Sequence, residues 1–142
     1  MRRIYLDYNA TTPVTPEVRD AMLPYLGEDY GNPSSVHAVG ARARKALDDA
    51  RESVARILKA QPREILFTSG GTESVQLAIR GVVTAASLAR GRKPVHVVTT
   101  AVEHSAVLSC LEALEAEGLA TSTRVGVDAL GRIDVEAFKT AF

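Results

Sequence analysis

The sequence has little cysteine, no tryptophan and no long apolar run. A single cysteine, Cys110, cannot form a disulfide within the chain, which favours a reducing compartment and a cytoplasmic setting. It lies in an apolar stretch at residues 106–111, where a buried structural role is expected rather than catalysis. Without a long apolar run, the sequence shows neither a signal peptide nor a membrane span.

The chain also lacks an excess of charge of either sign. Its 17 Lys and Arg residues balance 17 Asp and Glu residues, so it has no electrostatic footprint for binding nucleic acid or an anionic membrane. A local basic cluster is followed within two turns by acidic residues, which predicts a solvated helix face with i,i+4 ion pairs. With 46% hydrophobic residues over 142 positions, the chain is long and apolar enough for a globular core.

Both common nucleotide-binding fingerprints are absent, yet residues 67–73 suggest a phosphate site. An apolar run at 65–67 predicts a buried strand, and Gly70 and Gly71 follow it at once. Glycine can take positive φ and lets backbone N–H groups approach a ligand. A helical apolar stripe then begins at Val75, so this helix start would attract an anion. The pattern equally fits a tight connection, because Glu73 could neutralise the helix end itself.

The rest of the chain predicts an extended arm followed by an α/β domain. Residues 1–15 are predicted as the arm, in which 4–6 could add to a sheet and 9–13 turn the chain. Residues 16–142 are predicted as the first part of a larger domain. Its first predicted helix is capped by Thr15, with Pro16 at its first position, an apolar stripe that begins at Val18, and Gly27 at its end. A long helix is predicted over 39–58, with apolar residues that include Ile57 and Leu58 facing inward.

From residue 64 the pattern alternates between strands and helices. Strands are predicted at 64–68, 95–100 and 121–127, with helices over 73–83 and 106–117 and a last helix capped by Asp134. This order implies right-handed βαβ units, a parallel sheet and helices on both faces. Ligands of such sheets bind beyond the carboxyl ends of the strands, so residues 70–72 and 100–105 should lie at one edge. The unpaired sheet edge and the absence of a closing turn suggest that the chain is the opening portion of something larger.

His104 would lie at this ligand edge, where an imidazole could stack on an aromatic ligand and exchange protons. It could equally be a histidine that merely precedes a helix capped by Ser105. The residues alone leave both interpretations open.

Four segments occur together in order and spacing, at residues 5–13, 31–37, 67–73 and 103–104. Together they resemble the cysteine desulfurases of the class V aminotransferase group, from Ile4 to the last residue. The resemblance implies an incomplete aspartate-aminotransferase-like large domain of PLP fold type I. It also implies a pyridoxal 5'-phosphate (PLP) enzyme that takes sulfur from L-cysteine as an enzyme persulfide and releases L-alanine.

Carried onto this sequence, the resemblance assigns Gly71 and Thr72 to the cofactor phosphate, and His104 to stacking on its ring and to proton transfer. Glu73 would point away from the phosphate. The substrate side would include residues of two further segments: Asn9, Ala10, Thr11, Asn32, Ser34 and His37. No metal site is expected.

The sequence departs from the family where the reaction is carried out. The family's cofactor lysine, its aspartate on the pyridine nitrogen and its nucleophilic cysteine all lie beyond residue 142. None of the lysines considered matches the cofactor motif: Lys45, Lys59, Lys93 and Lys139. Cys110 matches a structural position, so the chain alone is expected to be inactive.

The alternatives are a fragment of a selenocysteine lyase or of another class V aminotransferase, and a catalytically dead remnant that acts as a binding module. The expected partners are the L-cysteine substrate, a sulfur-accepting scaffold protein for iron–sulfur cluster assembly, and either a second copy in a homodimer or the missing C-terminal segment.

Overall fold

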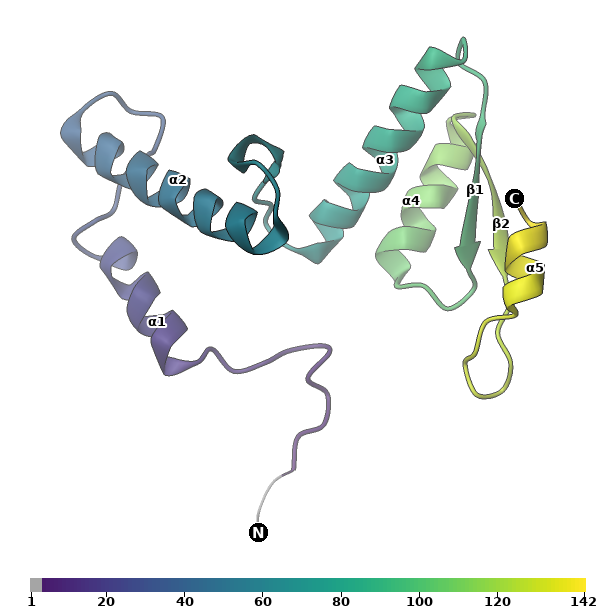
Figure 1. Cartoon of the computed structure of the whole chain (residues 1–142), viewed down its shortest axis with the longest axis horizontal. Coiled ribbons are helices and arrows are strands. Elements are labelled where there is room, and N and C mark those ends of the chain that lie inside the picture. The colour runs from purple at the N-terminus through teal and green to yellow at the C-terminus, as the bar shows by residue number, and fades with distance from the viewer. Residues whose placement is uncertain (1–3) are drawn as a thin grey trace. The chain divides into compact units, whose positions relative to one another are not determined.

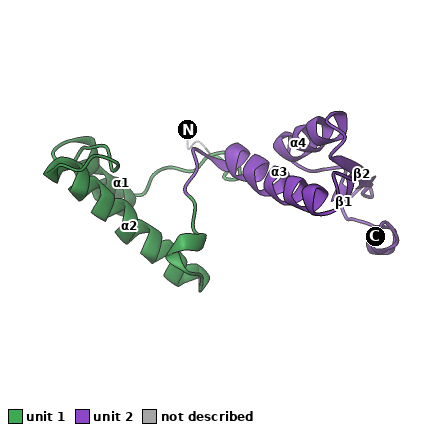
Figure 2. Ribbon diagram, turned by 90° about the horizontal axis from the view of Figure 1, so that it is seen from above, with its two compact units in different colours: residues 1–66 green, residues 67–142 purple. Residues whose placement is uncertain are grey.

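The computed structural model describes residues 4–142, which form two compact units with their boundary between residues 66 and 67 (Figure 2). Each unit is described by itself. The predicted boundary between arm and domain at residue 15 does not coincide with the boundary between these units. The units follow packing, whereas the prediction followed the positions of motifs.

The first unit is helical (Figure 1). It contains α1 (Pro16–Met22), the 3-10 helix η1 (Leu23–Leu26), α2 (Ala38–Leu58) and the 3-10 helix η2 (Pro62–Glu64). Thr15 occupies the N-cap position of α1, although its side chain makes no capping hydrogen bond, and Gly27 ends η1. The start of α1 and the end of η1 follow the prediction, because a proline and a glycine mark them. Helix α2 ends where predicted and begins one residue earlier, and η2 was not predicted.

Two expectations for this unit are wrong. Residues 4–6 form no strand; the arm instead turns at Asp7, whose carbonyl accepts hydrogen bonds from the N–H groups of Ala10 and Thr11. The apolar stripe of α1 is exposed, and at the end of α2 Ile57 and Leu58 are exposed as well. Within the first unit these side chains meet no surface that covers them.

The second unit is a βαβ fold. It contains α3 (Gly71–Ala89), β1 (Val95–Thr100), α4 (Ser105–Ala116), β2 (Ala120–Val125) and α5 (Val135–Thr140). The strands β1 and β2 pair in parallel, with Val95 opposite Ala120, as the alternating pattern predicts. The core joins α3, α4 and β2 through Val83, Cys110, Leu114 and Ala120. Cys110 is fully buried there, as expected.

The predicted strand at residues 64–68 does not form. Ile65 is extended, with φ −99° and ψ 122°, but among the described residues only β1 and β2 pair as strands, and Leu66 is exposed. A strand requires a neighbour that satisfies its backbone hydrogen bonds, and this segment has none. Helix α3 is longer than predicted, since its alanine-rich end continues to Ala89. Ala78 and Val82, which belong to the predicted apolar stripe that begins at Val75, are exposed.

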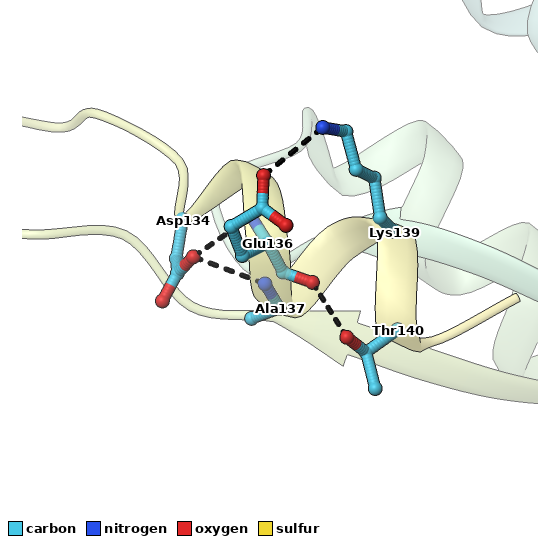
Figure 3. Close-up of polar contacts among 5 residues, drawn as sticks. All are labelled: Asp134, Glu136, Ala137, Lys139 and Thr140. Atoms are coloured by element: carbon cyan, nitrogen blue, oxygen red, sulfur yellow. Dashed lines mark hydrogen bonds and ion pairs between the residues drawn. The ribbon is translucent and has the colours of Figure 1, made fainter.

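The C-terminal helix α5 is capped as predicted (Figure 3). Asp134 Oδ1 accepts hydrogen bonds from the N–H groups of Glu136 and Ala137, both at 3.0 Å. Lys139 pairs with Glu136 at 3.0 Å, and the Thr140 hydroxyl donates to the Glu136 carbonyl. These contacts stabilise a helix of only six residues.

Candidate functional site

The N-terminus of α3 has free backbone donors. Gly70 lies at its N-cap position, and no side chain of the described residues caps this end. The Ser74 N–H donates to the Gly70 carbonyl at 3.0 Å and so begins the helical hydrogen bonding. The N–H groups of Gly71 and Thr72 precede that bond and have no acceptor four residues back in the helix. They can therefore hold an anion.

Glu73 does not occupy these donors. Its Oε2 atom accepts hydrogen bonds from the Ser69 hydroxyl and the Ser69 N–H, both at 2.6 Å. The hydroxyl first, and then the backbone N–H, lower the pKa of the Glu73 carboxyl. The carboxylate thus bonds to the residue before the N-cap and leaves the first-turn N–H groups free. This geometry removes the main support for the alternative in which Glu73 neutralises the helix end.

The glycines contribute to this turn because they lack a side chain, and not because they adopt positive φ. Gly70 has φ 165° and ψ −178°, an extended conformation that any residue can adopt, so the predicted reason is wrong. A Cβ atom built at Gly70 or Gly71 would meet no other atom within 4 Å. The missing side chains leave open space beside the first turn.

Thr68 and Ser74 also shape the turn, a role that the sequence analysis missed. Their hydroxyl oxygens lie 2.6 Å apart, so one hydroxyl donates to the other, and the remaining proton is donated to the Gly70 carbonyl, which lies 3.1 Å from Thr68 Oγ1 and 3.2 Å from Ser74 Oγ. The sequence feature that could have predicted this role is the presence of a hydroxyl residue on each side of the Gly-Gly pair.

His104 forms the N-cap of α4. Its Nδ1 atom accepts a hydrogen bond from the Ala106 N–H at 3.1 Å. The expected cap, Ser105, is instead the first residue of the helix. The preceding loop is fixed by the Thr100 hydroxyl, which donates to the Glu103 carboxylate at 2.9 Å. The imidazole ring is exposed.

The starts of α3 and α4 lie at the same end of the second unit, where β1 also ends (Figure 1). Gln76, in the second turn of α3, donates from Nε2 to the Ala106 carbonyl at 3.3 Å. Gly71, Thr72 and His104 therefore share the carboxyl edge of the parallel strands, as the βαβ pattern predicts.

The sequence-predicted residues of the first unit form local structures of their own. Asn9, Ala10 and Thr11 belong to the turn closed on Asp7, and the Thr11 hydroxyl lies 2.7 Å from the Tyr5 hydroxyl. These contacts stabilise the turn between Asp7 and Thr11.

The loop before α2 holds the other three. Asn32 Oδ1 accepts from the Ser34 N–H at 2.9 Å, and His37 caps α2 by accepting from the Gly40 N–H at Nδ1, at 3.3 Å. Gly40, which the sequence analysis missed, is buried against this loop. Asn32 Oδ1 and His37 Nδ1 thus have structural partners.

Within residues 4–142, no group of three or more His, Cys, Asp or Glu side chains is arranged to hold a metal ion. No helix in the same range is long and apolar enough to cross a membrane.

A parallel βαβ unit with an open helix start and a histidine at its carboxyl edge is typical of α/β proteins that bind an anionic ligand there. The sequence profile described as aminotransferase class-V matches residues 4–142. The chain belongs to this family.

Its relatives include cysteine desulfurases. The chain is 48% identical to cysteine desulfurase IscS of Methylobacillus flagellatus over 97% of its own length and 33% of that protein. It is also 48% identical to the cysteine desulfurase of Rattus norvegicus, over 99% of this chain and 30% of that one. The chain thus spans about a third of the length of the curated relatives it matches.

Solved structures show the same fold. A NifS-like protein matches 95% of this chain and 36% of its own, with a TM-score of 0.82 and 38% identity. A structure described as SspA in complex with cysteine matches 97% of this chain and 38% of its own, with a TM-score of 0.82 and 36% identity. The fold is therefore part of a large domain of PLP fold type I, as the resemblance predicts.

Proposed function

We propose that this chain supplies the cofactor-phosphate site of a PLP-dependent cysteine desulfurase. The complete enzyme would convert L-cysteine to L-alanine and transfer the sulfur to an enzyme cysteine as a persulfide, for iron–sulfur cluster or other sulfur-compound assembly. The desulfurase relatives, which match nearly the whole chain, support the reaction. The observation that carries the proposal is the open start of α3, with free N–H groups at Gly71 and Thr72 beside unfilled glycine positions.

The residues at this edge fit PLP. A phosphate dianion would accept from the first-turn N–H groups and from the Thr72 hydroxyl, and the positive end of α3 would stabilise its charge. The lack of side chains at Gly70 and Gly71 leaves room for the phosphate oxygens. When bound, PLP supplies an electron sink that weakens the bonds at the α-carbon of an amino acid.

In this proposal the chain's own residues bind the cofactor phosphate and orient the cofactor and the substrate. Glu73 binds Ser69, and the hydrogen-bonded pair of Thr68 and Ser74 hydroxyls binds the Gly70 carbonyl, so the turn keeps its shape before a ligand arrives. This preorganisation reduces the entropy lost on binding. His104 would stack on the pyridine ring. Asn9, Ala10, Thr11, Asn32, Ser34 and His37 remain proposed for the substrate side.

The groups that bind the cofactor covalently and accept sulfur are proposed to lie outside this chain. Cys110 is 0% exposed inside α4 and cannot reach a substrate without unfolding that helix. We therefore propose that the 142-residue chain is inactive alone. A cytoplasmic setting, a sulfur-accepting scaffold partner, and a homodimer or association with the remaining polypeptide belong to the same proposal.

Substitution of Thr72 tests the phosphate site in the protein that carries this chain. Thr72→Val removes the hydroxyl and keeps the shape, and should weaken PLP binding about 10–100-fold, since a hydrogen bond to a charged group contributes about 1.5–3 kcal/mol. Thr72→Ser is the matched control and should retain binding. The dissociation constant of PLP is measured by fluorescence titration. Equal affinities for the Val and Ser variants would contradict the assignment.

Product analysis tests the reaction. The chain alone should form no alanine from L-cysteine, and addition of the matching C-terminal segment should restore equal amounts of alanine and persulfide sulfur. A keto acid product would indicate an aminotransferase, and turnover of selenocysteine without cysteine would indicate a selenocysteine lyase. PLP-free, inactive protein with both pieces folded would favour the binding module.

A further inference from the structure

The hydrogen bond at His104 fixes where its ring proton lies. Nδ1 is 3.1 Å from the Ala106 backbone nitrogen, and a backbone amide nitrogen can only donate. Nδ1 must therefore present a lone pair. A neutral imidazole carries one proton, so that proton is on Nε2.

The surroundings hold the ring in this state. Ala106 is only 7% exposed, so its N–H would lose its partner without access to water if Nδ1 turned away. Among residues 4–142 no ion pair involves His104, and the nearby Glu103 carboxylate accepts from the Thr100 hydroxyl. Among the described residues Nε2 of His104 has no hydrogen-bond partner, and the residue is exposed.

We propose that His104 acts as a single-tautomer residue: Nδ1 is committed to the start of α4, and Nε2–H is the group that it offers to a ligand. A general base needs a free lone pair. Nε2 of the neutral ring has none, and Nδ1 can supply one only if the cap is broken. In this tautomer His104 offers its ligand a stacking ring and a hydrogen-bond donor. The identity of that ligand as PLP rests on the proposed function.

Nitrogen NMR tests the tautomer without any cofactor. In protein labelled with ¹⁵N-histidine at about pH 9, where ordinary imidazoles are neutral, Nδ1 of His104 should resonate as an unprotonated ring nitrogen and Nε2 as an N–H nitrogen. The substitutions His37→Asn and His96→Asn assign the signals of the other two histidines. A protonated Nδ1, or an averaged pair of signals, overturns the proposal.

A pair of variants tests the cap itself. His104→Asn places an oxygen where Nδ1 lies and should preserve the protection of the Ala106 amide against hydrogen exchange. His104→Gln cannot cap in this way and should increase exchange at Ala106 about fivefold, the usual effect of losing an N-cap. Equal exchange in the two variants overturns the proposal. If either variant fails to fold, the wild-type nitrogen spectrum still decides the tautomer.

Addition of PLP separates this proposal from the proposed function. If PLP binds, the Nε2 signal of His104 should shift and the Nδ1 signal should keep the character of an acceptor. A shift that converts Nδ1 to N–H overturns the present proposal. Failure of PLP to bind refutes the cofactor assignment, whereas the tautomer is already decided by the cofactor-free spectrum.

Discussion

Glu73 provides a pH-sensitive contact at the residue scale. Ser69 lowers its pKa in the folded chain, so the carboxylate stabilises the turn above the ordinary Glu pKa of about 4.3. This contribution is lost as the pH falls through the lower, folded value. We expect the Ser69 amide signal to titrate with a midpoint below about 4.3 in an NMR pH series.

The matched control for this titration is Glu73→Gln, which keeps the side-chain length and an oxygen acceptor but cannot titrate. Its Ser69 amide signal should stay constant over the same range. A wild-type midpoint at or above the ordinary Glu value would show that the carboxylate does not bind Ser69 in solution.

Two glycines inside helices should respond to alanine in opposite ways. A Cβ at Gly40 would clash with the Ser35 carbonyl oxygen and lie 2.7 Å from the Asn32 carbonyl oxygen. Gly40→Ala should therefore destabilise the fold by about 1–3 kcal/mol, as overpacking does. A Cβ at Gly81 in α3 meets nothing within 4 Å, so Gly81→Ala should stabilise the chain by about 0.5–1 kcal/mol.

Urea denaturation of both glycine variants measures these changes. Because the same substitution is made in each helix, helix propensity is shared and the difference reports the close approach of the 31–35 loop to α2. Equal effects at the two positions would mean that this loop does not pack against Gly40.

At the scale of elements, the packing of α4 against α3 and β2 depends on Leu114. This side chain is 0% exposed in the core that it shares with Val83 and Ala120. Leu114→Ala should reduce the free energy of unfolding by about 2–5 kcal/mol, because it leaves a cavity. Leu130→Ala, in an exposed loop, is the control and should change it by less than about 0.5 kcal/mol. Similar losses in thermal or urea denaturation would contradict this core.

The elements differ in how far the sequence predicts them. Strand β1 was predicted at its observed bounds, because an apolar run between turn residues suits a buried parallel strand. The run at 65–67 is also apolar but has no paired neighbour, and a local pattern does not reveal whether a partner exists. The start of α1 at Pro16 and the end of η1 at Gly27 were predictable from proline and glycine, whereas the cap that His37 gives α2 and the burial on α1 depend on contacts that no local pattern specifies.

The candidate site was predicted in its location more than in its chemistry. The βαβ order placed Gly71, Thr72 and His104 at one edge, where the structure has them. The capping role of His104 was missed because serine is the commoner N-cap residue, and only the coordinates show Nδ1 near the Ala106 N–H. The hydrogen bond from the Ser69 N–H to the Glu73 carboxylate depends on the rotamer of the Glu73 side chain, which a sequence pattern does not specify.

At the scale of the whole molecule, large apolar side chains remain exposed in both units. In the first unit Leu26 and Ile57 are exposed, and in the second unit an open groove of about 470 Å³ is lined by residues that include Val82, Val98 and Phe142. Monomeric soluble proteins rarely leave extended apolar surface uncovered. We therefore expect the isolated 142-residue chain to associate, either with copies of itself or with a polypeptide that covers these faces.

Light scattering and sedimentation over a range of concentrations measure this association. The average mass should rise with concentration above the 15.2 kDa of one chain. Val82→Thr adds a hydroxyl to the groove with little change in shape and should weaken association, because burying an unpaired hydroxyl is costly. Thr84→Ser, in the same helix, is the control and should leave the mass unchanged. A stable, monodisperse monomer at all concentrations would contradict the prediction, since it would show that these apolar faces need no partner.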